Sequence, residues 1–297
     1  MKHPTDNAVA VTAASGRLGR EILQSLLARC QPEQVVAVAR DPSRVQLAGI
    51  DKRRGNYESS EQMQAALTGI DTVVMISAPV AGGSDRLALH RNVIAAAKAA
   101  GVRKLIYTSV IGAELATQTM FAPFYAINRQ TEADLQASGL EWIAARNGLY
   151  LDLDLLHIRH ANEHGGVYRN NGGEGRCGYI SIAELGFALA ALACSDACNG
   201  QVVNLIGDTY TQAELVQFAN EAYGLSVRYE SISAQQNFAR FMADERIAAR
   251  GEDVAKMLTG CFEAIAIGAF DVPSDFVKAA GRKPLSIPEQ MAAIGRG

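Results

Sequence analysis

A run of small residues from Thr12 to Gly19 has the composition of a dinucleotide-binding turn. It reads Thr-Ala-Ala-Ser-Gly-Arg-Leu-Gly, follows a predicted strand at Val9–Thr12 and opens a predicted helix at Leu18–Arg29. In such a turn, backbone N–H groups and the positive end of the helix face a pyrophosphate. Gly16 lets the backbone approach the phosphates. We therefore predict cofactor contacts from Thr12, Ala14, Ser15, Gly16, Arg17 and Leu18.

The residue that follows the second predicted strand indicates which dinucleotide would bind. That strand, Val35–Ala39, ends at Arg40. An acidic residue there would accept hydrogen bonds from the ribose hydroxyls of NAD, whereas an arginine can hold the 2′-phosphate of NADP by paired hydrogen bonds. Arg17 in the turn offers a second cation. The two positions together favour NADP(H).

The first 150 residues alternate short β-branched runs with longer helical patterns, which indicates βαβ units and a parallel sheet. Several runs are apolar on both faces, as expected when helices cover both sides of the sheet. We predict a Rossmann-type, doubly wound α/β domain over residues 1–150. Its strands are expected at Val9–Thr12, Val35–Ala39, Lys52–Gly55, Thr72–Ile76, Lys104–Thr108 and Trp142–Ala145, and its helices at Leu18–Arg29, Ser60–Leu67, Arg86–Ala100 and Tyr125–Ser138.

Residues 151–297 show a different pattern and predict a smaller, mixed α/β substrate lobe, interleaved with the first domain. Gly165–Gly178 is rich in glycine and asparagine and is expected to be a loop or hairpin. Ser181 and Thr211 each precede a glutamate by three residues, which is the spacing of a helix capping box. The other elements expected here are a helix at Leu151–Glu163 and strands at Val202–Ile206 and Val227–Ile232.

The composition is that of an ordinary globular protein. The 297 residues are 48% hydrophobic and 20% charged, and the formal net charge is −3. This charge lacks the basic field that nucleic acid requires, so we expect no nucleic-acid partner. No stretch resembles a signal peptide or a membrane span, and five scattered cysteines fit a reducing compartment. We therefore expect a cytoplasmic protein without membrane partners.

Further blocks along the chain give a family resemblance. The chain resembles the NmrA-like branch of the atypical short-chain dehydrogenases/reductases, nearest to the bacterial NADPH-dependent quinone oxidoreductases and triphenylmethane reductases. The resemblance reaches past Gly200 and spans most of the chain. It is carried by the turn, read in the family as T-G-A-T-G-x-L-G, and by the blocks Arg40-Asp41-Pro42, Gly55-Asn56-Tyr57, Ser77-Ala78-Pro79, His90-Arg91-Asn92-Val93, Tyr107-Thr108-Ser109 and Ala145-Arg146-Asn147-Gly148-Leu149-Tyr150.

The resemblance implies NADP(H) as cofactor and a small molecule as substrate, and it leaves a homodimer open. It places further cofactor contacts at Asn56, Tyr57, Ser77, Ala78, Asn128 and Asn147, and it places Tyr150 near the substrate cleft. The aromatic side chain of Phe124 is a further candidate to line this cleft, with core packing as the alternative. The chain departs from the family at Ala13, which replaces the first glycine of the turn. Alanine costs little there if its φ is negative and crowds the turn if it is positive, so we expect weakened but not abolished binding.

Members of the wider superfamily transfer protons with a serine, a tyrosine and a lysine. This chain offers Ser109, then Tyr125 and Arg129, which lie four residues apart and so share a helix face. An arginine does not shuttle a proton as lysine does. The family alignment points instead to Asn128, where quinone reductases have histidine. The candidate catalytic residues are therefore Ser109, Tyr125, Asn128 and Arg129, with packing roles as the alternative reading.

The leading hypothesis is an NADPH-dependent reductase that passes hydride to a small conjugated acceptor such as a quinone. Two alternatives stay open: an NADP-binding redox sensor that acts through a protein partner without turnover, and an atypical epimerase or dehydratase that needs Tyr125 as acid–base. His157, His160 and His164 suggest a metal site by spacing alone. Because no carboxylate or cysteine cluster accompanies them, we favour a solvated helix face and expect no metal.

Overall fold

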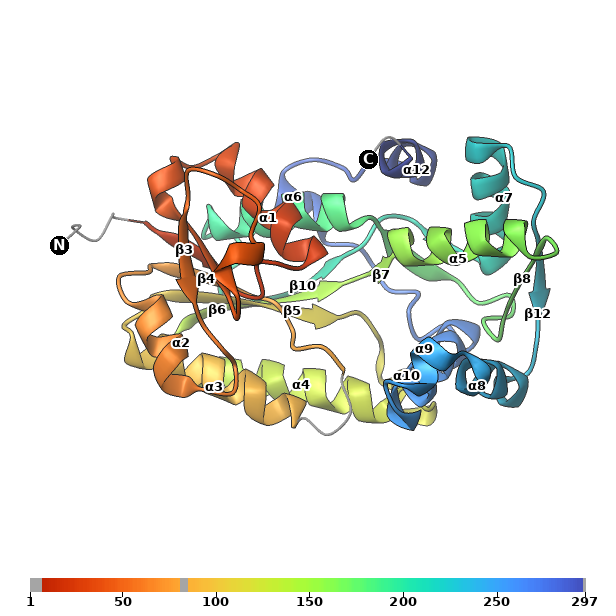
Figure 1. Ribbon diagram of the computed structural model, residues 1–297, viewed down its shortest axis with the longest axis horizontal. Coiled ribbons are helices and arrows are strands. Elements are labelled where there is room, and N and C mark those ends of the chain that lie inside the picture. Colours follow the sequence, from red (N-terminus) through yellow and green to blue (C-terminus); the bar gives the residue numbers. More distant parts are fainter. Residues whose placement is uncertain (1–6, 81–84, 296–297) are drawn as a thin grey trace.

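A seven-stranded parallel sheet forms the centre of the computed structural model, which describes residues 7–80 and 85–295 (Figure 1). The strand order is β10-β6-β5-β4-β1-β2-β3. This is the Rossmann order with a seventh strand added beside β6, so the predicted fold class is confirmed. The strands are β1 (Val9–Val11), β2 (Val35–Ala39), β3 (Asp51–Arg54), β4 (Thr72–Met75), β5 (Lys104–Val110), β6 (Glu141–Asn147) and β10 (Gln201–Leu205).

Helices cover both faces of this sheet (Figure 1). On one face lie α1 (Arg17–Leu27) and α6 (Ile182–Ala193), with α11 (Phe276–Ala280) beside α6. The opposite face carries α2 (Ser60–Leu67), α3 (Arg86–Ala99) and α4 (Ala122–Gln136). Each layer buries its own apolar cluster against the strands, which is why β1, β2 and β4 are buried along their whole length.

The second lobe packs around a third apolar cluster. Its elements are β7 (Leu149–Tyr150), α5 (Leu151–Glu163), β8 (Val167–Asn170), β9 (Cys177–Ile180), β11 (Thr209–Tyr210), α7 (Gln212–Tyr223), β12 (Arg228–Ser231), α8 (Ala234–Ala243), α9 (Glu245–Ala248), α10 (Glu252–Ala266) and α12 (Ile287–Ile294). β10 pairs with β6 in the central sheet and α6 packs on that sheet, although both follow residue 150. The interleaving of the two lobes stays a prediction. The boundary at residue 150 stays a prediction.

The expected loop or hairpin at Gly165–Gly178 is wrong. The segment contains β8 and the start of β9, and these strands do not pair with each other. β8 pairs in parallel with β12, whereas β9 pairs with β7 and β11. The partners are distant in sequence, so the local excess of glycine and asparagine hid both strands.

The two helix starts at Ser181 and Thr211 are confirmed. Thr211 and Glu214 form a reciprocal capping box, each side chain bonding the other's backbone N–H. Ser181 accepts a hydrogen bond from the N–H of Glu184, but the Glu184 carboxylate binds Arg282 instead of closing the box. The capping pattern therefore predicted both helix starts correctly, but it did not predict that Glu184 pairs with Arg282.

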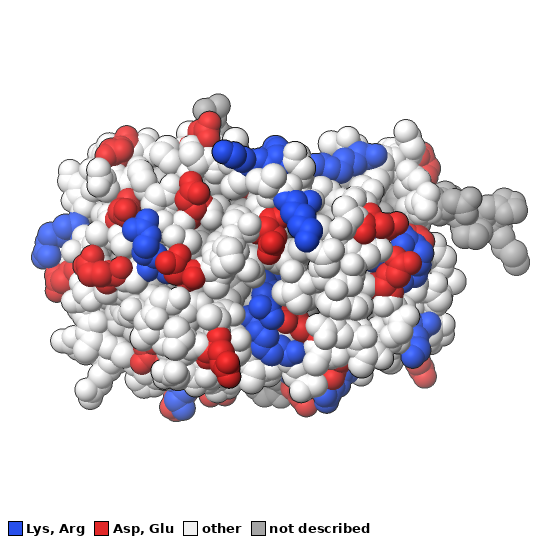
Figure 2. Space-filling model, turned by 180° about the vertical axis from the view of Figure 1, so that it is seen from behind, with Lys and Arg blue, Asp and Glu red and all other residues white. Residues whose placement is uncertain are grey.

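The surface carries mixed charge. Acidic and basic side chains are interspersed over the face shown in Figure 2. Within the described residues, no helix is both long and apolar enough to cross a bilayer.

The contact between α1 and α6 depends on Gly186. A Cβ at this position would lie 2.6 Å from the Cβ of Glu21 and 2.7 Å from its carbonyl carbon. The two helices therefore approach backbone to backbone, and a side chain would push them apart.

We predict that Gly186→Ala lowers the free energy of unfolding by about 1–3 kcal/mol through this overpacking, measured by denaturant unfolding. Ala183→Ser, at an exposed position of the same helix, is the matched control and should change stability by less than about 0.5 kcal/mol. An unchanged unfolding midpoint for Gly186→Ala would show that the interface between α1 and α6 can accommodate the added methyl group.

Candidate functional site

The turn between β1 and α1 lies at the switch point of the sheet, where β1 is flanked by β2 and β4. Gly16 is the N-cap of α1 and is extended, with φ −81° and ψ 169°. The backbone N–H of Ala14 donates to Val38 O at 3.1 Å, which ties the turn to β2. A Cβ on Gly19 would lie 2.7 Å from Ala14 Cα, so α1 packs directly on the turn.

Ala13 has φ +49°, the left-handed conformation that glycine adopts without penalty. Among the described residues other than glycine, only Asn7 shares a positive φ. The structure thus decides between the two alternatives for this departure from the family pattern: alanine is strained here. Weakened cofactor binding remains a prediction.

A cavity of about 360 Å³ opens beside the turn. Its wall contains Arg17 and Arg20 from α1 and Arg44 from the segment after β2. Three guanidinium groups around one cavity are suited to a phosphate group, which they can bind with charge-assisted hydrogen bonds. Arg40 is exposed and does not line this cavity.

Sequence reasoning missed Arg20 and Arg44. A local signal for Arg44 existed, because Asp41 accepts from the Ser43 N–H at 3.1 Å and caps the short helix that carries Arg44. The pattern Asp-Pro-Ser after a strand predicts such a turn. Arg20 lies one helical turn beyond Gly16 and had no distinguishing signal.

Thr12 and Tyr57 fasten three segments together. The Thr12 hydroxyl contacts the Tyr57 hydroxyl and accepts from the N–H of Ile76 at 3.1 Å. Tyr57 donates to Ile76 O at 2.7 Å, and burial raises the pKa of this phenol. Asn56 is half-buried and bonds Glu58. Thr12 and Tyr57 thus hold the end of β4 against the turn.

Ser77 and Ala78 follow β4, and their polar groups face neighbouring segments. Ser77 bonds Thr108 through both its hydroxyl and its N–H. The N–H of Ala78 donates to His90 Nε2 at 2.9 Å. Burial lowers the pKa of His90 to about 3. This imidazole is therefore neutral, and its Nδ1–H donates to the Thr131 hydroxyl at 2.9 Å.

Asn128 is buried, and its amide is engaged within the protein. Its Oδ1 accepts from the Tyr107 hydroxyl at 2.8 Å, and its Nδ2 donates to Phe124 O at 2.7 Å. Arg86 approaches the same Oδ1 at 3.5 Å. Asn128 therefore holds α4 against β5 and α3, and its predicted catalytic role stays a prediction.

Arg86 is the unexpected side chain of this region. Only 6% of its surface is exposed, and its guanidinium lies 4.4 Å from the centre of the Phe124 ring. Its Nε donates to Ala78 O at 2.7 Å, whereas Nη1 has no hydrogen-bond partner within the described residues. No carboxylate of the described chain forms an ion pair with it. Burial lowers its pKa, the expected effect on a desolvated cation.

A second buried group lacks a partner at the end of β6. Asn147 donates from Nδ2 to the Tyr150 hydroxyl at 3.4 Å, while its Oδ1 accepts no hydrogen bond from the described residues. Burial raises the pKa of Tyr150, and the charge of Arg86 acts in the opposite direction. Buried polar groups are nearly always paired. The Nη1 donor of Arg86 and the Oδ1 acceptor of Asn147 are therefore available to bind a further molecule.

The predicted pair Tyr125 and Arg129 shares a helix face, and the two side chains are in contact. The Arg129 guanidinium lies over the Tyr125 ring at 4.3 Å from its centre. It pairs with buried Glu132 at 2.6 Å, and Ser109 and Arg146 bond the same carboxylate. Ser109 and Arg129 thus belong to a buried ionic network. Their catalytic assignment stays a prediction.

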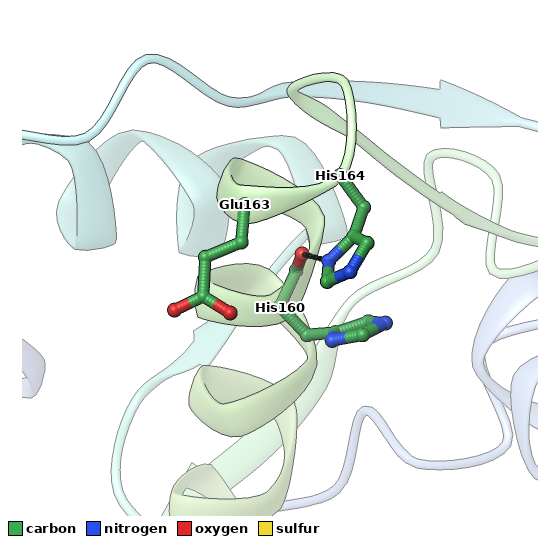
Figure 3. A group of neighbouring side chains, drawn as sticks. All are labelled: His160, Glu163 and His164. Carbon is green, nitrogen blue, oxygen red and sulfur yellow. Dashed lines mark hydrogen bonds between the residues drawn. The ribbon is translucent and has the colours of Figure 1, made fainter.

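Two histidines and one glutamate gather at the end of α5. The ligand atoms of His160, Glu163 and His164 lie within 4.8 Å of one another, and all three residues are exposed. Sequence reasoning was wrong that no carboxylate accompanies these histidines. Figure 3 shows the two imidazoles on one side and Glu163 on the other, with His164 Nδ1 bonded to the His160 carbonyl oxygen. A separate cavity of about 600 Å³ borders this group and includes His157, but not Phe124 or Tyr150.

The described residues fit an NADP(H) molecule. The cavity beside the turn supplies cations for phosphate, the turn supplies small residues and a helix N-terminus, and the ends of β4 and β6 carry Ala78 and Asn147 at the same edge of the sheet. In a doubly wound sheet, ligands bind at this carboxyl edge. The unpaired Oδ1 of Asn147 can accept a hydrogen bond from a carboxamide there.

Known proteins resemble the chain over nearly its whole length. Quinone oxidoreductase 2 of Escherichia coli (strain K12) is 29% identical over 291 residues, which are 96% of this chain and 98% of that protein. The crystal structure of an NADPH-dependent quinone oxidoreductase from Escherichia coli with NADPH superposes with a TM-score of 0.85 at 27% identity, covering 97% and 99% of the two chains.

A second solved structure agrees. The crystal structure of the triphenylmethane reductase of Citrobacter sp. in complex with NADP(H) superposes with a TM-score of 0.84 at 26% identity. The match covers 97% of this chain and 99% of that one. The resemblance inferred from the sequence motifs is confirmed by these similarities. The model of a family described as NAD(P)H-binding matches residues 13–171, more than half of the sequence. This protein belongs to the NAD(P)H-binding family.

Proposed function

We propose that the protein is an NADPH-dependent reductase of a small conjugated acceptor such as a quinone. Support comes from the phosphate-suited cavity beside the turn and from relatives named for the reduction of quinones and triphenylmethane dyes. The cofactor, when bound, supplies a hydride. Arg17, Arg20 and Arg44 hold its phosphates, and Asn147 orients its carboxamide.

The observation that carries the proposal is the buried, uncompensated charge of Arg86. A conjugated carbonyl that accepts hydride gains negative charge on its oxygen. A fixed cation in a site from which water is excluded stabilises such charge strongly. Phe124 covers Arg86 and offers an apolar face to a flat acceptor. The pair would bind the acceptor and stabilise its reduced form.

Acid–base groups play a smaller part in this proposal. His90 is neutral at physiological pH, because its pKa lies near 3, and it is buried behind Ala78. The Arg129 guanidinium stacks over the Tyr125 ring, 4.3 Å from its centre. A reduced quinone can take its protons from solvent, so the main task is to hold acceptor and cofactor in contact.

We predict that the protein oxidises NADPH in the presence of quinones and that Arg86→Met lowers kcat/KM about a hundredfold, because one stabilising cation is lost. Nucleotide oxidation is followed spectroscopically, with folding checked by circular dichroism. Arg91→Met, on the same helix at an exposed residue paired with Asp134, is the matched control and should retain full activity. Absence of NADPH oxidation with every quinone and dye tested would reject the reductase.

We predict that Arg44→Ala weakens NADPH binding about tenfold while NADH binding changes little, because only NADPH carries the 2′-phosphate. Titration of each nucleotide by calorimetry measures this difference. Arg53→Ala serves as control, since Arg53 pairs with Asp51 and does not line the cavity. Equal losses for both nucleotides, or tighter binding of NADH by the natural chain, would contradict an NADP-specific site.

We predict that Ala13→Gly binds NADPH more tightly, by about 1 kcal/mol or a factor of about five, because the methyl group of Ala13 no longer crowds the left-handed turn when the cofactor enters. The same titration measures the effect. Ala14→Gly is the control, as Ala14 has no positive φ. If both variants bind NADPH with the affinity of the natural chain, the left-handed conformation of Ala13 has no effect on cofactor binding.

The sensor alternative is favoured by one observation, namely that Asn128, Ser109 and Arg129 are all engaged in internal contacts. A sensor would bind NADP⁺ and NADPH with different affinity and show no turnover. An epimerase or dehydratase needs a working Tyr125, so the turnover of Tyr125→Phe separates it from a reductase. A cytoplasmic location, which the free thiols fit, and a homodimer also stay predictions.

A further inference from the structure

Two thiols that are 164 residues apart in sequence meet at the ends of two packed helices. Cys30 follows the last turn of α1, and Cys194 is the C-cap residue of α6. Their sulfur atoms lie 3.4 Å apart, and both cysteines are free.

The backbones that carry these thiols are fixed. The N–H of Cys30 donates to Leu26 O at 2.7 Å, and the N–H of Cys194 donates to Ala190 O at 3.2 Å. α1 and α6 approach each other closely at Gly186. A disulfide bond is about 2.05 Å long, so the sulfurs must move only about 1.3 Å to reach it.

Exposure makes this pair accessible to reagents. Cys194 is exposed and Cys30 is half-buried, whereas Cys177 and Cys198 are buried. A small molecule can therefore reach the pair from solvent.

We propose that Cys30 and Cys194 form a reversible thiol-modification site that a low-molecular-weight disulfide closes to an intramolecular disulfide bond. This site is separate from the proposed reductase site and does not depend on it. Its ligand class is a small thiol compound in its oxidised form, such as glutathione disulfide.

The chemistry proceeds by two exchanges. The Cys30 thiolate attacks one sulfur of the small disulfide, forms a mixed disulfide and releases one small thiolate. Cys194 then loses its proton to solvent and attacks Cys30 Sγ, which releases the second small thiolate. The two protein thiols are oxidised by two electrons in total, and the small disulfide is reduced to two thiols.

The electrostatics order these steps. Burial and the neighbouring Cys30 raise the pKa of Cys194 to about 12. This raised pKa disfavours Cys194 as the first nucleophile, so the exchange is written with Cys30 attacking first. Once Cys30 is in a mixed disulfide, it has no thiolate charge that could oppose the ionisation of Cys194. The positive charges of Arg29 and Lys104 still lower the pKa of Cys194. Both sulfurs lie at the negative ends of helices, so the reaction is slower than at an activated thiolate.

The experiment uses the full chain incubated with glutathione disulfide, quenched by alkylation and digested for mass spectrometry. We expect a cross-linked peptide pair that contains Cys30 and Cys194, with two hydrogen atoms fewer than the reduced pair, and its reversal by dithiothreitol. We also expect a higher midpoint of thermal unfolding for the oxidised chain, because the bond joins α1 to α6.

Three variants distinguish this pair from general thiol oxidation. Cys194→Ser should stop at a mixed disulfide on Cys30, and Cys30→Ser should form no cross-link. Cys198→Ser is the matched control, four residues from Cys194, and should cross-link like the natural chain. A cross-link that persists in Cys30→Ser, or no cross-link in the natural chain while the folded protein loses thiols elsewhere, would overturn the proposal.

Discussion

The hydroxyl of Thr12 joins three segments at the switch point of the sheet, and the site depends on this junction. It contacts Tyr57 after β3 and accepts from the N–H of Ile76 after β4, while the turn after β1 begins at Thr12 itself. These bonds fix the ends of neighbouring parallel strands at one edge, where a doubly wound sheet binds its ligands. The cavity lined by Arg17 adjoins the turn after β1, and Ala78, whose carbonyl oxygen accepts from Arg86, follows β4. Without this junction, the turn after β1 and the segment after β4 would no longer be held together, and both are proposed to contact the cofactor.

Two regions near the proposed active site contain arginine side chains, and they differ in whether a carboxylate pairs with these arginines. Glu132 neutralises only one of the two arginines that bond it, Arg129 and Arg146, and Arg86 has no ionic partner among the described residues. An unpaired buried cation is costly unless a ligand completes it. This cost explains why such a group belongs at a site where negative charge forms during the reaction. In the proposed reductase, Arg86 would stabilise that negative charge electrostatically.

Local pattern predicted the elements of the first domain well, because their β-branched runs and capping residues act over short distances. The family motifs predicted the cofactor class. Long-range pairing was beyond such reasoning: β8 becomes a strand only beside β12, and the meeting of Cys30 with Cys194 follows from how α1 packs on α6. The role of Arg86 was also hidden, since an arginine at a helix start usually faces solvent. Its burial depends on Phe124 and Ala78, which come from other elements.

The most direct test of the account is a rate measurement with NADPH that carries deuterium at one of its two C4 positions. A fixed site presents only one C4 hydrogen to the acceptor, so quinone reduction should be slower with one labelled stereoisomer and unchanged with the other, and the label should leave the cofactor. Equal rates for both stereoisomers, with no loss of label from either, would contradict hydride transfer in a preorganised site.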